Sequence, residues 1–330
     1  MKVCIVGAGA IGGYIGARLA VAGQAQVSAI ARGATLQALR SHGWRVREAG
    51  ALLQSPAHAT DRPEDLGAQD LVVIAVKGPA LAAAAAGLVP LIGPDTLVLP
   101  AMNGVPWWFI QGRAGLDDAP LASVDPGGRI AAAIPLAQVL GCVVHISTST
   151  PEPGLVQHQM GRGLIIGEPG SGDTPRAQRI AALLAQAGFD AKVSPDVRKD
   201  IWYKLWGNLT MNPISAITGA TVDRILADPL VRAFCSAAMQ EAAAIGQHVG
   251  CPVAQAPEDR HKITAGLGPF KSSMLQDVEA QRPIELDGIV AATRELGQRA
   301  GLQTPNIDAL LGLTRLFGRV HGLYPEASAA

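Results

Sequence analysis

Residues 1–32 contain the pattern that most restricts the fold of this chain. Lys2 to Val6 is a short apolar run, and it leads directly into Gly7-Ala8-Gly9-Ala10-Ile11-Gly12, which has the spacing G-x-G-x-x-G. A helical pattern then continues to Ala22, and a second apolar run extends from Val27 to Ala31. This β-α-β order predicts a dinucleotide site, because the glycines let the backbone approach a pyrophosphate at the N-terminus of the helix.

Each glycine of the pattern has its own expected role. Gly7 permits a tight turn after the strand, Gly9 permits the close approach of the pyrophosphate, and Gly12 permits the helix to pack on the strand. The free N–H groups of the first helical turn and the helix dipole both favour an anion there. We therefore expect residues 7–12 to bind the cofactor.

The end of the second strand indicates which dinucleotide is bound. An NAD site usually carries an acid about 20 residues after the glycines, where it bonds the ribose 2′-OH. Here the sequence is Ile30-Ala31-Arg32-Gly33, and no acid occurs between Gly7 and Glu48. A planar guanidinium is well shaped to pair with a 2′-phosphate. We therefore predict NADP (NADPH); the alternative is that Arg32 is a solvated loop residue.

Composition limits the class of protein. A chain of 330 residues is longer than one typical core, which predicts two domains. The formal net charge is zero, which argues against nucleic acid or a membrane surface as a partner. No apolar run is long enough to span a membrane. The four cysteines form no CxxC pattern, so we expect reduced thiols, a cytoplasmic protein and no metal site.

Strand and helix patterns alternate over roughly the first third of the chain. Residues 44–54 predict two strands joined at Gly50, while 70–76 and 96–100 are apolar runs typical of a buried parallel sheet. Lys77 directly follows the first of these runs, and Asn103 closely follows the second. Because ligands bind at the carboxyl ends of such strands, Lys77 and Asn103 are predicted to lie near the glycine loop.

The pattern changes after residue 124. Residues 141–150 predict a strand, 155–158 and 164–166 predict a hairpin around Met160-Gly161-Arg162-Gly163, and a helix and a strand follow at 174–187 and 191–194. Beyond Pro195 we find only helical periods, at residues 197–218, 224–249, 259–267, 272–281, 284–300 and 304–318. The predicted fold class is α/β, with a Rossmann-type dinucleotide-binding domain over 1–195 followed by an all-helical domain over 196–330.

The start of the helical domain carries an unusual polar stripe. Lys204, Asn208 and Asn212 are spaced i, i+4 and i+8, so they share one face of a helix that is otherwise rich in large apolar groups. Such a stripe favours a polar cleft, where burial lowers the pKa of an ammonium and suits it to proton donation. The alternative is the solvated face of an amphipathic helix. Pro213 also disfavours regular helix at Asn212.

Two later motifs have simple structural explanations. Ser273 with Gln276 forms a capping-box pattern. Glu285, two residues after Pro283, is expected in the first turn of a helix, where a carboxylate offsets the dipole.

Taken together, these pieces make the whole chain resemble the ketopantoate reductase (2-dehydropantoate 2-reductase) family. The matching segments cover both predicted domains in the family's order: GAGAIGG, Arg32, VKG at Lys77, MNGV at Asn103, KLWGNLTMNPISAITG, SSMLQD and IELDG. The resemblance implies NADPH-dependent reduction of the 2-oxo acid ketopantoate to pantoate, on the route to pantothenate and coenzyme A.

The resemblance also implies roles for individual residues. Lys204 would be the general acid, Glu285 would hold the substrate hydroxyl, and Ser273 would hold the substrate carboxylate. Asn208 and Asn212 would orient substrate and lysine. Asn103 would bond near the nicotinamide ribose, and Lys77 would lie along the cofactor.

Three features leave the substrate open. The family often has a further asparagine where this chain has Thr221-Val222-Asp223, two bulky side chains (Trp107 and Trp108) follow Asn103, and the segment 123–134 looks long. The alternatives are reduction of a different 2-oxo acid, ketone or imine on the same fold, and a non-catalytic NADPH-binding protein. The sequence fits either a monomer or a homodimer.

Overall fold

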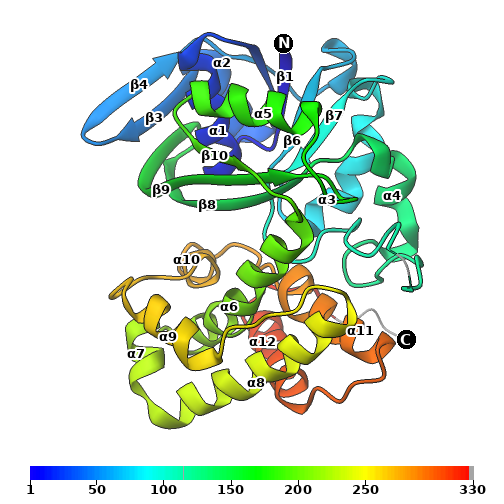
Figure 1. The fold of residues 1–330 in the computed structure, drawn as a ribbon. Helices are drawn as coiled ribbons and strands as arrows, with labels where there is room; N and C mark the ends of the chain where they lie inside the picture. The colour runs from blue at the N-terminus through cyan, green and yellow to red at the C-terminus, as the bar shows by residue number, and fades with distance from the viewer. Residues whose placement is uncertain (114, 327–330) are drawn as a thin grey trace. The chain divides into compact units, whose positions relative to one another are not determined.

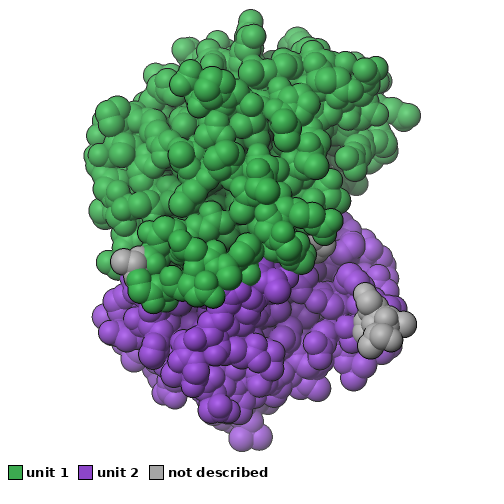
Figure 2. Space-filling view, turned by 90° about the vertical axis from the view of Figure 1, so that its right-hand side faces the viewer, with its two compact units in different colours: residues 1–102, 106–120, 125–200 green, residues 103–105, 121–124, 201–330 purple. Residues whose placement is uncertain are grey.

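The computed structural model describes residues 1–113 and 115–326, which form two compact units, coloured separately in Figure 2. Unit 1 contains Met1–Met102, Pro106–Pro120 and Asp125–Asp200; unit 2 contains the chain from Ile201 onward together with Asn103–Val105 and Leu121–Val124. The units divide within one helix, after Asp200, and unit 2 includes two short segments from the first half of the chain. A domain boundary at residue 195 stays a prediction from the sequence.

Unit 1 is built on a five-stranded sheet with the order β5-β2-β1-β6-β7, in which every neighbouring pair is parallel. Figure 1 labels β1, β6 and β7 of this sheet. The strands are β1 (Lys2–Val6), β2 (Gln26–Ile30), β5 (His58–Thr60), β6 (Leu71–Ile74) and β7 (Leu97–Pro100). Both β6 and β7 are buried along their whole length, which explains why their sequences are continuously apolar. The predicted parallel sheet is confirmed.

The register brings the carboxyl ends of four strands to one edge of this sheet. Val6 of β1 pairs with Ile30 of β2 and with Ile74 of β6, and Ile74 pairs with Pro100 of β7. The strand order reverses beside β1, which is where ligands bind in sheets of this type. The segments that follow these strands therefore start from the same edge, as predicted.

A second sheet, which the sequence did not predict, lies on the other side of α1 (Ala10–Ala22). Its strands are β3 (Trp44–Glu48), β4 (Ala51–Ser55), β8 (Gly141–Glu152), β9 (Leu155–Gly167) and β10 (Asp190–Val193). Two glycines let α1 approach it closely. A Cβ at Gly13 would lie 2.8 Å from Val156, and one at Gly16 would lie 2.4 Å from the ring of Trp44.

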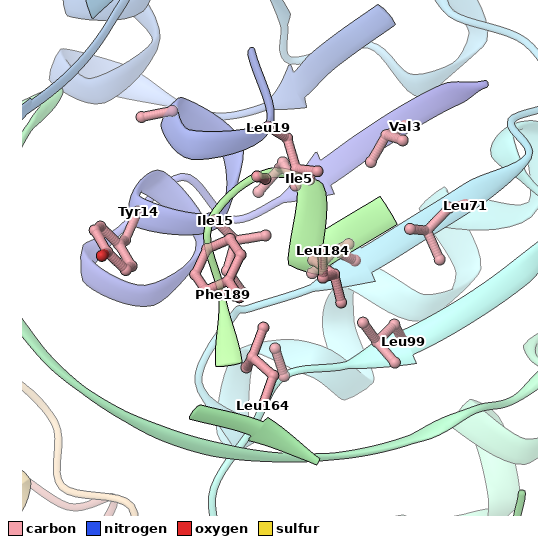
Figure 3. Close-up of a cluster of buried hydrophobic side chains, with 14 of the residues drawn as sticks. Val3, Ile5, Tyr14, Ile15, Leu19, Leu71, Leu99, Leu164, Leu184 and Phe189 are labelled. Atoms are coloured by element: carbon pink, nitrogen blue, oxygen red, sulfur yellow. The ribbon is translucent and has the colours of Figure 1, made fainter. Parts of the chain in front are cut away.

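The two sheets share one apolar core with α1 and α5 (Pro175–Gln186), shown in Figure 3. Ile5 of β1, Ile15 of α1, Leu164 of β9 and Leu184 of α5 are each fully buried in it. The loop between β1 and α1 is therefore attached to a closely packed frame.

The predicted hairpin around residues 160–163 is wrong. β9 runs without a break from Leu155 to Gly167, and its antiparallel partner is β8, joined to it at Pro153-Gly154. Gly161 has φ +77°, but it lies opposite a register shift in β8, where a Cβ would come within 2.4 Å of the carbonyl oxygen of His145. This glycine serves a β-bulge, whereas Gly154, with φ +71°, makes the turn.

A buried carboxylate ties the second sheet to α1. Glu48 of β3 accepts hydrogen bonds from Tyr14 (2.6 Å) and Arg18 (2.7 Å) of α1 and from Arg162 (3.0 Å) of β9. Burial opposes the charge, but the hydrogen bond from Tyr14 and the two guanidinium groups hold the pKa of Glu48 below its ordinary value. The ionised carboxylate thus joins three elements of unit 1.

We expect Glu48→Ala to lower the free energy of unfolding by about 3 kcal/mol at neutral pH, because it leaves the partly buried guanidinium of Arg18 without its carboxylate. Since the folded pKa is depressed, this contribution is present above the ordinary value of 4.5 and is lost as the pH falls through the folded value. Urea unfolding at neutral pH and below pH 4.5 should show the difference between variant and wild type shrinking in acid. Glu64→Ala, which removes an exposed partner of Arg62, is the control. A pH-independent loss would exclude ionisation as the cause.

The described residues of unit 2 contain helices and no strand. The helices are α6 (Val197–Thr218), α7 (Val222–Ala227), α8 (Pro229–His248), α9 (Pro257–Ala265), α10 (Ser273–Glu279), a π-helix (Asp287–Ala291), α11 (Ala292–Arg299) and α12 (Pro305–Val320). The predicted helix 224–249 is divided at Asp228-Pro229, where the Asp228 side chain accepts from two N–H groups of α8. No helix in the described part of the chain has the length and apolarity to cross a membrane.

The aromatic pair that left the substrate open belongs to unit 1, as do residues 125–134 of the long segment, whereas residues 123 and 124 belong to unit 2. Trp107 and Trp108 are 2% and 1% exposed. The segment 123–134 contains α4 (Arg129–Ala133), and the buried carboxylate of Asp125 accepts from the N–H groups of Ile130 (2.8 Å) and Ala131 (3.0 Å) at its start. Val222 is likewise 2% exposed, in an apolar cluster of unit 2.

Candidate active site

Two of the three glycines after β1 are required by the protein's own packing. Gly7 has φ +92°, and a Cβ on it would lie 2.7 Å from Val76. A Cβ on Gly12 would lie 2.1 Å from the carbonyl oxygen of Gly7 and 2.9 Å from Ala75. Any side chain at either position would collide with the loop or the sheet.

Gly9 differs, because a Cβ there would have no atom of the protein within 4 Å. It is the N-cap of α1, no side chain caps the helix, and no acid lies in the first turn, which begins with Ala10 and Ile11. Ala8, just before it, is buried. Open space before free N–H groups is what a pyrophosphate requires, so these residues fit a dinucleotide.

Arg32 lies at the start of a second uncapped helix. It follows β2 and is the N-cap of α2 (Gly33–His42), with no side-chain cap and no acid in the first turn. Its side chain is exposed. An exposed guanidinium beside free N–H groups at the end of β2 fits a 2′-phosphate and offers no acceptor to a ribose 2′-OH.

Lys77 follows β6 and is the half-buried N-cap of α3 (Gly78–Ala85). It therefore starts from the same sheet edge as the glycine loop. Among the described residues, no group of three or more His, Cys, Asp or Glu side chains is arranged to hold a metal ion.

The central contact of unit 2 joins Lys204 to Asn103. The half-buried ammonium of Lys204, on α6, donates a hydrogen bond to Asn103 Oδ1 at 2.7 Å. Asn103 is held in turn by the two residues after it: the N–H of Val105 donates to Gly288 O at 2.7 Å, and Gly104 adopts φ +84° against the same backbone. Sequence reasoning placed Asn103 near the cofactor but did not predict that it pairs with the lysine.

The polar stripe of α6 continues from Lys204 through Asn208 to Asn212. The interruption expected before Pro213 does not occur, because residues 211–216 are all buried and packing outweighs the local cost of the proline. Asn212, 5% exposed, directs its Nδ2 toward Ser273 Oγ at 3.4 Å. Asn208, one turn before it, is half-buried.

Ser273 is not the helix cap that its sequence pattern predicts. Ser272 caps α10 by accepting from the N–H of Leu275 at 3.1 Å, and it also bonds Ser215 of α6. Ser273 is the first residue of α10, and its side chain is exposed. The capping role thus falls to its neighbour, and the Ser273 hydroxyl lies beside the amide of Asn212.

Glu285 precedes its helix instead of lying in the first turn. Residues 282–286 are not helical, and a π-helix begins at Asp287. Single turns of π-helix occur frequently at functional sites. Glu285 is half-buried, and it is three residues before Gly288, which bonds the Asn103 segment.

In unit 2, the polar side chains that the sequence predicted for the active site therefore lie on elements that contact one another. A lysine bonded to an amide oxygen, two further amides, a hydroxyl and a carboxylate come from α6, α10 and the segments around Asn103 and Glu285. These groups can donate a proton and bind a polar, anionic molecule. Sequence reasoning missed the hydrogen bond between Asp287 and Tyr324; the pattern IELDG contains the aspartate, but no signal pointed to the tyrosine.

The parallel sheet, the glycine loop and the lysine-centred group fit an NAD(P)-dependent reductase or dehydrogenase. Two family models match the chain, ketopantoate reductase PanE/ApbA over residues 3–171 and its C-terminal counterpart over residues 196–317. The chain belongs to the ketopantoate reductase family, as its sequence pattern indicated.

Individual relatives cover almost the whole chain. A 2-dehydropantoate 2-reductase from Mesorhizobium japonicum is 43% identical over 98% of this chain and 100% of its own. A protein from Ralstonia solanacearum MolK2, provisionally named a ketopantoate reductase, has a crystal structure with 55% identity and TM-score 0.95, covering 98% of this chain and 99% of its own. D-mandelate dehydrogenase shares the fold at 21% identity and TM-score 0.84, covering 98% and 100%.

Proposed function

We propose that this protein reduces ketopantoate to pantoate with NADPH, and that Lys204 is the proton donor. The observation that carries the proposal is the hydrogen bond from Lys204 Nζ to Asn103 Oδ1 at 2.7 Å, on a helix that also presents Asn208 and Asn212. Family membership supports ketopantoate as the substrate, since the match to the 2-dehydropantoate 2-reductase from Mesorhizobium japonicum covers the full length of that relative.

NADPH, when bound, supplies the hydride that adds to the ketone carbon. Gly7 to Gly12 and the first turn of α1 would bind its pyrophosphate, Arg32 would pair with its 2′-phosphate, and Lys77 and Asn103 would contribute to its binding. This assignment rests on the open space at Gly9 and on the two uncapped helix starts.

The other groups act on the substrate. As charge develops on the ketone oxygen, Lys204 Nζ protonates it, and Asn103 holds the ammonium in place through its amide oxygen. Ser273 and Asn212, whose side chains lie 3.4 Å apart, bind the carboxylate, and Asn208 orients the substrate beside the lysine. Glu285 accepts a hydrogen bond from the substrate's hydroxyl group.

The direct test is to follow the loss of NADPH absorbance when purified protein is mixed with ketopantoate, alongside a panel of other 2-oxo acids. Fast, saturable turnover with ketopantoate as the preferred substrate is the expected result. Absence of turnover with every carbonyl tested, while NADPH still binds, would instead support a non-catalytic NADPH-binding protein.

Reduction of another 2-oxo acid, a ketone or an imine is the second candidate. It is favoured by the Thr221-Val222-Asp223 sequence where the family often has an asparagine, and by the same fold in D-mandelate dehydrogenase. A substrate without a hydroxyl group does not require Glu285. Glu285→Ala should therefore raise KM for ketopantoate strongly but leave KM unchanged for such a substrate.

Arg32→Ala should weaken NADPH binding by roughly 10- to 100-fold, the range expected for losing a charge-assisted hydrogen bond, while NADH binding changes little. Titration of cofactor fluorescence with both dinucleotides measures this. Arg47→Ala removes the same charge from an exposed position of unit 1 and serves as the control. Equal losses for NADPH and NADH would mean that Arg32 does not contact the 2′-phosphate.

We also place the protein in the cytoplasm, as a monomer or a homodimer. Its four cysteines are buried thiols, which suits a reducing compartment. Microscopy of the tagged chain and analytical ultracentrifugation test these two assignments.

A further inference from the structure

The C-terminal residues of the described chain bind the segment that carries Glu285. The N–H of Ile284 donates to Leu323 O at 3.0 Å, and the hydroxyl of Tyr324 donates to Asp287 Oδ1. These two hydrogen bonds flank Glu285, one residue before it and two residues after it. Both partners come from the turn that follows α12.

This turn is well packed. The N–H groups of Leu323 and Tyr324 both donate to Gly318 O, at 2.7 and 3.1 Å, and Leu323 is 2% exposed. Gly318 also makes room for the contact, because a Cβ there would lie 2.7 Å from Tyr324 Cβ and 3.1 Å from Ile284. The tyrosine therefore reaches Asp287 from a fixed position.

The Glu285 segment is held at a third point by the segment that carries Asn103. Gly288 O accepts from the N–H of Val105 at 2.7 Å, and Gly104 packs so closely on Gly288 that a Cβ would come within 2.4 Å of its oxygen. Asn103 is the residue that bonds Lys204. The backbone around Glu285 is thus held by Leu323 and Tyr324 on one side and, on the other, by Gly104 and Val105, which directly follow the lysine's partner.

The Tyr324 hydroxyl is suited to this role at neutral pH. Burial, together with the hydrogen bond to Asp287, raises the pKa of Tyr324 above its ordinary value, so the hydroxyl stays protonated and able to donate. Burial also raises the pKa of Asp287, and the hydrogen bond from Tyr324 opposes that rise. Removing the hydroxyl would leave a partly buried carboxyl group without this donor.

We propose that Tyr324 is a positioning residue for Glu285: through Asp287 it fixes the backbone that presents the carboxylate to the substrate hydroxyl. The proposal rests on the function proposed above for Glu285. It makes a residue close to the end of the described chain a determinant of substrate binding, although Tyr324 itself lies 39 residues beyond Glu285 in the sequence.

Tyr324→Phe tests the proposal because it removes one hydroxyl and keeps the ring. We expect kcat/KM for the preferred 2-oxo acid to fall by roughly 10- to 100-fold, mainly through KM, since small displacements of a binding group have effects of this size. NADPH affinity should not change. Tyr14→Phe is the matched control, because it removes a tyrosine hydroxyl bonded to Glu48 in unit 1 and should leave KM unaltered.

A double-mutant cycle separates positioning from general destabilisation. In a Glu285→Ala background, Tyr324→Phe should raise KM no further, because the group it positions is absent. Asp287→Asn, which keeps an oxygen to accept from Tyr324, should retain KM better than Asp287→Ala. An equal KM effect of Tyr324→Phe with and without Glu285, or no KM effect at all, would overturn the proposal.

Hydrogen exchange gives a readout that needs no substrate. Tyr324→Phe should speed exchange of the amides of residues 284–290, and Tyr14→Phe should not. Unchanged exchange in that segment would overturn the proposal whatever the kinetics show. If the wild type reduces none of the 2-oxo acids tested, the proposed function fails by that result alone, and the exchange comparison still decides whether Tyr324 holds the segment.

Discussion

Lys204→Ala should lower kcat by roughly 10²- to 10⁴-fold, the usual range for the loss of a general acid. NADPH affinity should stay nearly intact, because the cofactor residues of unit 1 are unaltered. Asn103 would lose the ammonium that donates to it at 2.7 Å, but neither group is fully buried, so a large loss of stability is not expected. Single-turnover kinetics under saturating NADPH measure the chemical step directly.

The matched control is Lys199→Ala, on the first turns of the same helix. Lys199 is 53% exposed and pairs with Asp196 at 3.2 Å, so its removal costs one surface ion pair and should leave kcat unchanged. An unchanged kcat in Lys204→Ala would remove the lysine from the mechanism. An equal loss of kcat in both variants would indicate a disturbed helix and not the loss of the Lys204 ammonium group.

Gly9→Val should abolish NADPH binding without unfolding the protein. A Cβ at Gly9 meets no atom of the protein within 4 Å, so a side chain there has room. A branched side chain would nevertheless occupy the space that a pyrophosphate needs. The loss of two or more hydrogen bonds to phosphate predicts an affinity decrease of at least about 100-fold, measurable by fluorescence titration.

Gly12→Val is the informative comparison. Its Cβ would collide with the carbonyl oxygen of Gly7 at 2.1 Å, so both stability and NADPH binding should be lost. Thermal unfolding therefore distinguishes the two positions: the midpoint should be close to wild type for Gly9→Val and much lower for Gly12→Val. A low midpoint for both would mean that Gly9 serves the fold and not the ligand.

Local patterns predicted much of the fold because several elements have strong local causes. The bounds of α6 agree with the predicted 197–218, and β1, β6 and β7 follow from apolar runs that end at Gly7, Lys77 and Pro100. β5 (His58–Thr60) has no apolar run and was not predicted. A glycine in a strand region can form either a turn or a β-bulge, and the sequence alone does not distinguish the two. Gly154 and Gly161 both have positive φ, yet one makes a turn and the other a bulge, and only the pairing of β8 with β9 decides between them.

In the candidate site, too, the sequence predicted the local features but not the contacts between distant residues. Spacing placed Lys204, Asn208 and Asn212 on one face of α6, since helical periodicity is local. The contact between Lys204 and Asn103 spans 101 residues, and the support of Asp287 by Tyr324 spans 37. Such contacts depend on how distant segments fold back, which a single sequence does not encode in any local pattern. The choice of Ser272 over Ser273 as helix cap similarly depends on Ser215 of a different helix.

Unit 2 includes two short segments from the first half of the chain, residues 103–105 and 121–124. They limit where the chain can be joined to that of a relative to make a functional chimera. Glu295 accepts from the N–H groups of Ala122 and Ser123 and from the Ser123 hydroxyl, at 2.7–2.9 Å. Val105 likewise supplies the donor for Gly288. A chimera joined at residue 200 would combine these donors and acceptors from different parents. Exchange of substrate preference between relatives should therefore require residues 103–105 and 121–124 to be transferred together with the C-terminal half.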